Sequence, residues 1–336
     1  MRLSDIDYEL PERLIAQTPI EPRDSARLLV DRGSAAPRDA TVRDLPSLLR
    51  TGDVLVVNDT KVVPARLHLV RSTGGAVEVL LLEPLDDTHR EWEALIRPGR
   101  KMKPGEQLFL ADGSDAVIVN GRGVRGDTFR VSFTVDTPDA LVERIGEMPL
   151  PPYITQRLSD TSRYQTVYAQ TAKSAAAPTA GLHFTPELLA QIRGQGVPIV
   201  SVELVVGLDT FAPVTVDDPR DHVMHTESYH VPTETLAAVQ AAKRVVAVGT
   251  TATRALESVG ATGKTSGRTD LFITRGFRFS HVDVLMTNFH MPRTTLLLMI
   301  DAFVGGRWRQ LYRHAIDQQY RFLSFGDAML LDRHAQ

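Results

Sequence analysis

Apolar residues along this chain fall into two patterns that alternate over most of its length. Continuous apolar runs end in small or polar residues, as in DVLVVND at residues 53–59 and VVAVG at 245–249. Between such runs lie segments with apolar positions three or four residues apart, such as TETLAAVQAAKR at 233–244. The first pattern predicts buried strands and the second amphipathic helices. Strands that alternate with helices favour a layered α/β/α domain.

The stretch from residue 62 to about 133 has a different pattern. Short β-rich runs follow one another there, separated by turn clusters such as STGG and ADGSD. This spacing predicts a small β-barrel, closed by a helix at TPDALVERIGE with Thr137 as its cap. The proline-rich MPLPPYI that follows predicts a stiff connector. We therefore expect a discontinuous α/β domain at residues 1–61 and 151–336, interrupted by a barrel-like domain at 62–150.

Four more elements are predicted toward the C-terminus. DLFIT at residues 270–274 and VDVLMTNF at 282–289 predict strands, because both are apolar and follow turn signals. TTLLLMIDAFVGG and RWRQLYRHAIDQQY predict two helices, the first with Thr294 as its cap. Near the end of the chain, Asp327 in YRFLSFGDAML is a candidate cap for a last helix.

Composition excludes several classes of protein. The 336 residues contain no cysteine, which excludes disulfides, thiolate catalysis and thiolate metal sites. The formal net charge of -3 gives no bulk attraction to nucleic acid, so an RNA partner requires local basic groups. The N-terminal residues do not resemble a signal peptide, and no segment approaches the length of a membrane span. We expect a globular protein of the cytoplasm.

The segment AAAPTAGLHF at residues 175–184 is the first candidate for chemistry. Small residues including Ala180 and Gly181 let a ligand approach the backbone, Thr179 brings a hydroxyl, and His183 brings an imidazole, a group suited to acid–base chemistry. Thr185 and Pro186 then begin a predicted helix, whose free N–H groups suit anionic or polar ligands. The alternative is a tight turn that contains a hydrogen-bonded histidine.

AVGTTATRALES at residues 247–258 is the second candidate. A buried strand ends at Gly249, and Thr250 and Thr251 offer hydroxyls where a helix begins, as at ligand sites of open α/β sheets. Arg254 and Glu257 are three residues apart and share a face of this helix. The segment lacks the GK[ST] ending of a phosphate-binding P-loop. A capped helix with a surface ion pair is the alternative.

Three other segments contain groups that can titrate or bind a ligand. DHVMHTE contains His222, His225 and Glu227, with His230 close behind, which predicts either a metal site or the polar lining of a cleft. TNFHMPR contributes Asn288 and His290, and the alternative is ordinary helix capping beside a core histidine. YRFLSFGDAML places Arg321 and Asp327 among aromatic residues, as at a nucleoside contact or at the edge of a core.

Two basic groups are candidates for contacts with RNA phosphates. RPGRKMK contains Arg97, Arg100, Lys101 and Lys103. GRWRQLYRH contains Arg307 and Arg309, and its Trp308 and Tyr312 are the right type of residue to stack on bases. The alternative for each group is a solvated charged face.

Together these segments resemble one family, the S-adenosylmethionine:tRNA ribosyltransferase-isomerases of queuosine biosynthesis. The resemblance covers nearly the whole chain. It is carried by DYELPERLIAQTPIEPRDSARLLV, GDVLVVNDTKVVPARL, MPLPPYI, RYQTVYA, AAPTAGLHFT, AVGTTATRALES, TNFHMPRTTLL and YRFLSFGDAML. It implies a β-barrel inserted in an α/β body, in agreement with the pattern at residues 62–150.

The resemblance also implies a reaction. S-adenosylmethionine, a co-substrate here, gives its ribosyl part to the aminomethyl group of a 7-aminomethyl-7-deazaguanine at the tRNA wobble position. Adenine and methionine leave, and epoxyqueuosine forms. The sulfonium acidifies the C5′ hydrogens, so a positioned base is required.

We expect that base among His183, His225, His290 and Glu227. Asp327 or Glu257 is expected to contact adenine, and Thr179, Thr250 and Asn288 the ribose hydroxyls. Arg163, Arg254 or Arg321 is expected to hold the methionine carboxylate or a phosphate. No cofactor, no metal and no membrane contact are implied, and the protein is expected to act as a monomer.

The sequence departs from the family pattern at three positions. LVVGLDTF stands where the family has LHVGxGTF, so Val205 replaces a histidine and Asp209 a glycine. Lys173 stands where a glycine is usual. These departures leave open a family paralogue that binds nucleotide or RNA with altered or lost transfer activity. A metal-assisted hydrolase that uses DHVMHTE is a third hypothesis.

Overall fold

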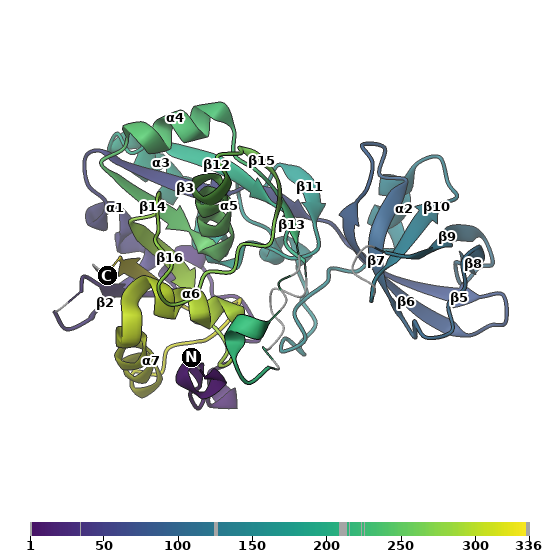
Figure 1. Ribbon diagram of the computed structural model, residues 1–336, viewed down its shortest axis with the longest axis horizontal. Helices are drawn as coiled ribbons and strands as arrows, with labels where there is room; N and C mark the ends of the chain where they lie inside the picture. Colours follow the sequence, from purple (N-terminus) through teal and green to yellow (C-terminus); the bar gives the residue numbers. More distant parts are fainter. Residues whose placement is uncertain are drawn as a thin grey trace.

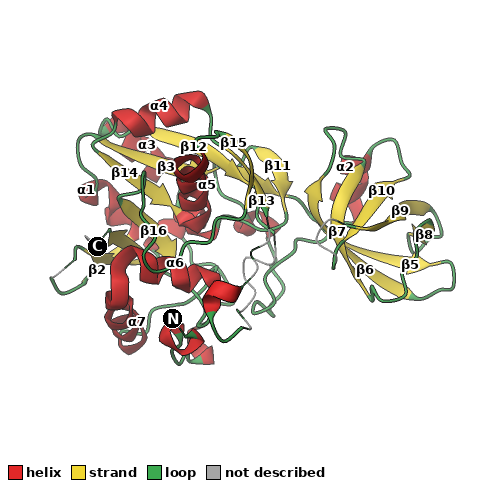
Figure 2. Ribbon diagram, in the orientation of Figure 1, coloured by secondary structure: helices red, strands yellow, loops and turns green. Residues whose placement is uncertain are grey.

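The computed structural model describes residues 2–33, 35–123, 127–207, 214, 216–222, 224 and 226–333. Two bodies stand side by side in Figure 1, an α/β domain that contains both ends of the chain and a barrel joined to it by loop segments. Figure 2 shows that helices lie against the sheet of the larger body, whereas the smaller body is almost entirely strands. The predicted fold class is therefore confirmed.

A mixed sheet of nine strands, counted over the described residues, forms the α/β domain. The strand order is β15 (Ser266–Thr269), β13 (Glu227–His230), β12 (Ile199–Leu204), β3 (Asp53–Asn58), β14 (Arg244–Val248), β16 (Val284–Asn288), β17 (Ala328–Asp332), β1 (Arg27–Asp31) and β2 (Arg38–Thr41). Strands β12, β3, β14 and β16 are parallel, so their carboxyl ends lie at one edge. Strand β17 is antiparallel to β16 and therefore begins at that same edge.

Successive residues of the central strands enter two separate cores. Val54 and Val56 belong to one apolar cluster, and Leu55 and Val57 to the other. This is the period-two alternation of a strand with both faces covered. The first face packs against α4 (Thr233–Ala241), α5 (Gly249–Thr262), α6 (Thr295–Val304) and α7 (Trp308–Asp317). The second packs against α1 (Leu45–Leu48) and α3 (Pro186–Gly194).

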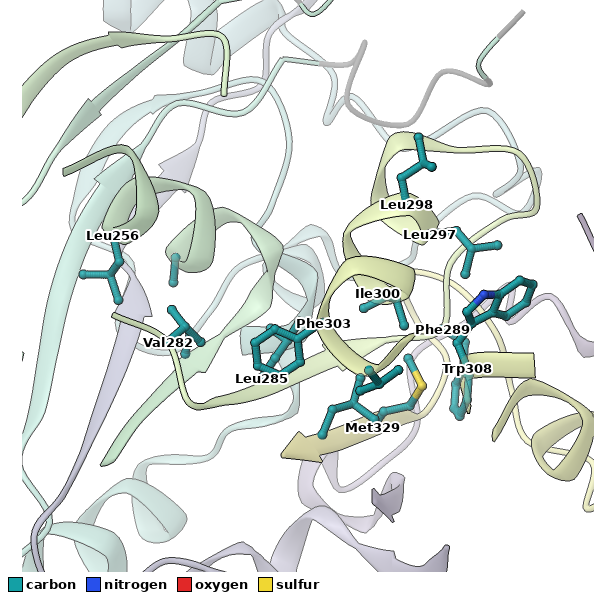
Figure 3. Close-up of a cluster of buried hydrophobic side chains, with 14 of the residues drawn as sticks. Leu256, Val282, Leu285, Phe289, Leu297, Leu298, Ile300, Phe303, Trp308 and Met329 are labelled. Carbon is teal, nitrogen blue, oxygen red and sulfur yellow. The ribbon is translucent and has the colours of Figure 1, made fainter. Parts of the chain in front are cut away.

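Figure 3 shows the first core around Leu285 and Phe303. Side chains of α5, α6 and the sheet interdigitate there, and Phe289 is fully buried beside Trp308 and Tyr312. Burial of such large apolar side chains contributes about 2 to 3 kcal/mol each, which holds the ends of β14 and β16 in place. The position of the loops that follow these strands is therefore set by the core.

The insert is a closed barrel in the strand order β10 (Phe129–Phe133), β7 (Glu91–Arg97), β6 (Ala76–Pro84), β5 (Arg66–Arg71), β8 (Glu106–Phe109) and β9 (Asp115–Arg122). Helix α2 (Pro138–Ile145) packs on it through Leu141 and Val142. Barrel and helix lie within the predicted insert. Thr137 is the N-cap residue of α2, as predicted, although its side chain makes no capping hydrogen bond.

Short contacts join the two domains. Where the chain enters the barrel, β4 (Thr60–Val62) pairs with β11 (Thr171–Ser174), and within the barrel domain Arg66 pairs with Glu147 beside the connector. Glu83, near the end of β6, forms a 2.8 Å ion pair with Arg268 of β15 and also accepts a hydrogen bond from Ser228. The carboxyl end of β6 therefore faces the α/β domain.

The C-terminal predictions are only partly confirmed. Residues 270–274, predicted as a strand, form none, because Leu271 and Ile273 pack against α6 instead of pairing with a strand. Residues 328–332 form β17, so Asp327 caps no helix. Thr185 and Thr294 are confirmed as caps, accepting from the N–H groups of Leu188 and Leu297. Within the described residues, no helix is long and apolar enough to cross a membrane.

Candidate functional site

Three segments meet at the carboxyl edge of the parallel strands. Residues 249–251 follow β14, residues 289–291 follow β16, and the 3-10 helix η6 (Thr179–His183) lies across both. In open α/β sheets ligands bind at this edge. The three segments line a concave site, which we call the strand-end pocket.

The strand-end pocket combines hydroxyl, amide and imidazole groups with apolar walls. Its lining residues are Tyr153, Ala177, Pro178, Thr179, Ala180, Val206, Gly249, Thr250, Thr251, Thr287, Asn288, Phe289, His290, Met291, Thr294, Leu296, Leu323 and Ser324. The structure thus brings His290 and six of the nine predicted substrate-binding residues into the lining. The other three are Gly181, which lies within η6, and Arg254 and Arg321, which do not line the pocket.

Thr179 and Asn288 form the polar centre of the pocket. The Thr179 hydroxyl donates to Asn288 Oδ1 at 2.9 Å. The Asn288 amide nitrogen donates to the carbonyl oxygen of Asp327 at 3.4 Å. These two hydrogen bonds orient the Asn288 amide, because its oxygen must face the Thr179 hydroxyl and its nitrogen the Asp327 carbonyl. η6, β16 and the start of β17 are therefore linked by polar contacts at this point.

His290 is the imidazole that lines the pocket. Its Nε2 is 3.0 Å from the Thr287 hydroxyl, and its backbone N–H donates to the Tyr312 hydroxyl at 3.0 Å. The residue is 8% exposed, and burial lowers its pKa to about 3. His290 is therefore neutral at physiological pH. No hydrogen-bond partner of its Nδ1 lies among the described residues.

His183 is buried beside the pocket and does not line it. Its Nδ1 is 3.1 Å from the Ala180 carbonyl oxygen, and its Nε2 is 2.9 Å from the Gly326 carbonyl oxygen. Both ring nitrogens therefore face backbone acceptors, and the ring joins η6 to the turn before β17. Its predicted part in acid–base chemistry stays a prediction.

Asp327 is also turned away from the pocket. Its carboxylate oxygens accept the backbone N–H groups of Arg27 and Arg321, both at 2.8 Å. Glu257 accepts four hydrogen bonds from residues 280–282 at the far end of α5. Both acceptors are occupied inside the protein, and a contact of either with adenine stays a prediction.

Glu227 and Arg254 form a buried ion pair behind the first turn of α5. Glu227 Oε1 also accepts the Gly207 N–H at 3.2 Å. The alternative of a surface ion pair between Arg254 and Glu257 was wrong, because both residues are buried and Glu227 of β13 supplies the carboxylate that faces Arg254. Arg163 and Arg321 instead donate to carbonyl oxygens of the N-terminal segment, those of Ile20 and Thr18.

Two glycines at the pocket are needed for different reasons, Gly249 for its backbone conformation and Gly181 for space. Gly249 has φ +91°, in the region that favours glycine, and a Cβ added to it would lie 3.6 Å from Ala180 Cβ. A Cβ on Gly181 would come 2.0 Å from the Tyr168 hydroxyl oxygen and 2.9 Å from Thr166 Cγ2. Gly181 is thus required for packing under the pocket.

The described residues of the histidine-rich segment, His222, Glu227 and His230, do not line the pocket. Glu227 and His230 are at the two ends of β13, His222 packs near Phe272, and His225 lies outside the described residues. Within the described part of the chain, no group of three His, Asp or Glu side chains is arranged to hold a metal ion.

Of the three family departures, the structure fully describes only Val205, which does not line the strand-end pocket. Val205 lines a second depression between β12 and the β6–β7 turn of the barrel, with Glu203 and His230. The position of the missing histidine is therefore outside the strand-end pocket. Asp209 and the side chain of Lys173 lie outside the described residues.

The two basic groups differ in their surroundings. The first group is exposed and consists of Arg97, Arg100, Lys101 and Lys103. It lies at the end of the barrel away from the α/β domain, because Arg97 of β7 is opposite Glu78 in the strand register, and the Pro84 end of β6 is the one that faces the α/β domain. Arg307 is ion-paired with the buried Asp31, and Arg309 donates to the Asp5 carbonyl oxygen. Base stacking by Trp308 and Tyr312 was wrong, because both are core residues.

Sequence reasoning missed two polar lining residues. Tyr153, in the connector, lies with its hydroxyl 2.7 Å from the Ser324 hydroxyl, and burial raises its pKa to about 12. Thr287 is at the end of β16, where it contacts His290. The prolines around Tyr153 indicate only a stiff connector, so the sequence gives no sign that Tyr153 lines the pocket. Thr287 directly precedes Asn288, and its position near the end of a predicted strand could have identified it as a lining residue.

Comparisons with known proteins agree over the whole chain. Residues 3–331 match the family model described as Queuosine biosynthesis protein. A relative from Symbiobacterium thermophilum named S-adenosylmethionine:tRNA ribosyltransferase-isomerase is 50% identical, over 98% of this chain and 100% of the relative. One of the same name from Nitrosomonas europaea is 48% identical, over 99% and 97%.

A solved structure is similar as well. The crystal structure of S-adenosylmethionine tRNA ribosyltransferase from Thermotoga maritima is 37% identical in sequence to this chain. The structural alignment covers 97% of this chain and 99% of the Thermotoga chain, with a TM-score of 0.55. The similarity therefore includes both domains.

Proposed function

The chain belongs to the family of queuosine biosynthesis proteins, and from this premise we propose that the strand-end pocket holds S-adenosylmethionine during ribosyl transfer to tRNA. The protein is an enzyme, an S-adenosylmethionine:tRNA ribosyltransferase-isomerase that acts in tRNA modification. Its acceptor is the aminomethyl group of 7-aminomethyl-7-deazaguanine at the wobble position. Adenine and methionine leave, and the product is epoxyqueuosine.

One observation carries the assignment of the pocket. Three segments that bear the family resemblance, those of Thr179, Gly249 and Asn288, meet at a single concave site. Their hydroxyl and amide groups suit the ribose hydroxyls of a nucleoside, and apolar side chains such as Met291 and Leu323 suit the flat face of adenine. We assign ribose contacts to Thr179, Thr250 and Asn288.

His290 is the best-placed candidate for proton transfer at C5′. It lines the pocket, it is neutral at physiological pH, and Thr287 holds its Nε2. A neutral imidazole accepts a proton without first losing one. A sulfonium close by acidifies the C5′ hydrogens and so offsets the weak basicity of the buried ring.

His183 is proposed as a positioning residue. Its two hydrogen bonds to backbone carbonyls tie η6 to the turn at Gly326. Thr179 is the first residue of η6, so the ring sets the distance between that hydroxyl and Asn288. Asp327 supports the same contact from the other side through its backbone.

The acceptor tRNA is proposed to contact both domains, because it is much larger than the pocket. The exposed residues Arg97, Arg100, Lys101 and Lys103 are assigned to its phosphates. Arg307 and Arg309 contribute less, since both already hold protein acceptors. We propose that the enzyme works in the cytoplasm as a monomer and without a cofactor.

Adenine release from S-adenosylmethionine in the presence of tRNA bearing the deazaguanine tests the proposal. The wild-type protein is expected to release adenine, and Asn288→Ala to lose at least about tenfold in kcat/KM, the usual effect of removing a hydrogen-bonding group from a site. Asn120→Ala, the same change on the exposed barrel strand β9, is the matched control and should retain full activity. Normal turnover by Asn288→Ala would remove the strand-end pocket from the reaction.

A further inference from the structure

Helix α5 begins at the strand-end pocket with an open N-terminus. The residue before it, Val248, has no side chain that can cap, and no side-chain cap hydrogen bond is formed. Gly249, Thr250 and Thr251 line the pocket. The first N–H groups of a helix have no partner inside the helix and carry partial positive charge. This end of a 14-residue helix therefore offers donors to a ligand.

A second, independent feature lies at the same place. Thr251 is 7% exposed, and its hydroxyl oxygen is buried without a hydrogen-bond partner among the described residues. Thr253, two residues on, differs, because its hydroxyl donates to the Gly249 carbonyl oxygen at 3.1 Å. A buried hydroxyl without a partner is unfavourable, so a ligand that accepts its hydrogen bond gains affinity.

The charge nearby favours an anion. Arg254 is one turn further along α5 and is 4% exposed. Glu227 accepts from one of its nitrogens, whereas Nε and Nη2 have no hydrogen-bond partner within the described part of the chain. Because Glu227 offsets the charge of this guanidinium, the positive charge at Thr251 comes from the helix end, and the two unbonded nitrogens of Arg254 add hydrogen-bond donors behind it.

We infer that the N-terminus of α5 and the Thr251 hydroxyl form a subsite for the α-carboxylate of S-adenosylmethionine. The inference rests on the proposed function and adds the orientation of the substrate. The carboxylate is the one anionic group of that molecule and accepts hydrogen bonds from both donor types. The amino-acid part then lies against α5, and the ribose against Thr179 and Asn288.

Binding of two ligands tests the subsite. The dissociation constants of S-adenosylmethionine and of its analogue with hydrogen in place of the α-carboxylate are measured by calorimetry. Wild type should bind S-adenosylmethionine about tenfold or more tighter than the analogue, since a hydrogen bond to a charged group contributes that much. Thr251→Val should reduce this preference about tenfold by weakening only the carboxylate-bearing ligand, through loss of that hydrogen bond. Thr251→Ser should restore it.

The matched control is Thr253→Val, the same change on the same helix, which should retain the wild-type preference. An unchanged preference in Thr251→Val overturns the inference, and so does an equal loss for both ligands, because then Thr251 only shapes the pocket. Weaker tRNA binding by Thr251→Val with unchanged S-adenosylmethionine binding would assign the subsite to an RNA phosphate and also overturn it. If wild type binds neither ligand, the proposed function itself fails.

Discussion

The hydroxyl of Thr179 donates a 2.9 Å hydrogen bond to the amide oxygen of Asn288, a residue 109 positions further along the chain. Thr179 comes from a short helix above the sheet and Asn288 from the last position of a central strand. The contact therefore joins two separate layers of the α/β domain at the strand-end pocket, where we propose that the substrate binds. Its loss should affect binding or chemistry more than folding.

The first prediction concerns this contact. Thr179→Val, which removes the hydroxyl at nearly constant volume, should lower kcat/KM for adenine release about ten- to a hundredfold, and Thr179→Ser should restore most of it. In a double-mutant cycle with Asn288→Ala, the two losses should not add, because they remove the same contact. Additive losses would show that the two residues act independently.

The second prediction concerns the pair of Arg254 and Glu227. Arg254→Met leaves the Glu227 carboxylate buried without its guanidinium and should lower the free energy of unfolding by about 3 to 5 kcal/mol. The double variant Arg254→Met/Glu227→Gln should recover part of that loss, since no buried charge remains. Urea denaturation followed by Trp308 fluorescence, in a Trp92→Phe background, reports on the α/β domain.

The matched control removes an exposed pair of the same type. Arg130→Met on barrel strand β10 separates a guanidinium from Glu91, and both side chains are more than a third exposed. It should change stability by less than about 1 kcal/mol. A similarly small effect of Arg254→Met would contradict the view that the buried pair is tightly coupled.

The third prediction concerns pH. Burial lowers the pKa of His290 to about 3 from an ordinary value of 6.5. Between these two values the unfolded chain binds a proton that the folded protein does not. The free energy of unfolding therefore falls as pH falls through that window, and this contribution is fully present above about pH 6.5. From about pH 7 to about pH 5 the loss should be about 2 kcal/mol.

Replacement by a residue that does not titrate tests this origin. His290→Asn should be less stable than wild type at about pH 7, but the difference should shrink by about 2 kcal/mol at about pH 5. His68→Asn, on an exposed position of barrel strand β5, should keep the wild-type pH dependence. Parallel curves for wild type and His290→Asn would assign the acid sensitivity to other groups.

The fourth prediction concerns packing below η6. Gly181→Ala places a methyl group 2.0 Å from the Tyr168 hydroxyl oxygen and should lower the free energy of unfolding by about 1 to 3 kcal/mol. Affinity for S-adenosylmethionine should fall as well, because η6 moves with Thr179. Gly194→Ala, where no atom lies within 4 Å of the new Cβ at the end of α3, should be neutral or stabilising. Equal stability of the two variants would mean that Tyr168 moves freely.

The fifth prediction concerns RNA. The double variant Lys101→Gln/Lys103→Gln should reduce the slope of log affinity for tRNA against log salt concentration by roughly 1.4 to 1.8. Lys264→Gln, an exposed lysine after α5, is the control and should leave the slope unchanged. An unaltered slope in the double variant would place the RNA away from the end of the barrel. Fluorescence anisotropy of labelled tRNA at several salt concentrations measures wild type and both variants.

The architecture followed from local patterns. Continuous apolar runs such as residues 53–59 and the short β-rich runs of the insert predicted most strands, because burial on both faces or on one face leaves a direct mark on residue order. Two C-terminal segments were predicted wrongly from such patterns. β17 follows directly on Gly326 and Asp327, which resemble a helix cap, and residues 270–274 are apolar because they cover α6.

The amino-acid sequence by itself determined the family, the strand–helix alternation and the segments that meet at the pocket. Only the tertiary structure decided which polar groups face the pocket. His183 and His290 are equivalent as sequence signals, yet the first faces two backbone carbonyls and the second lines the pocket. The physical reason is that the partners of a buried side chain are backbone groups distant in the chain, such as Gly326 for His183, and no local pattern records them.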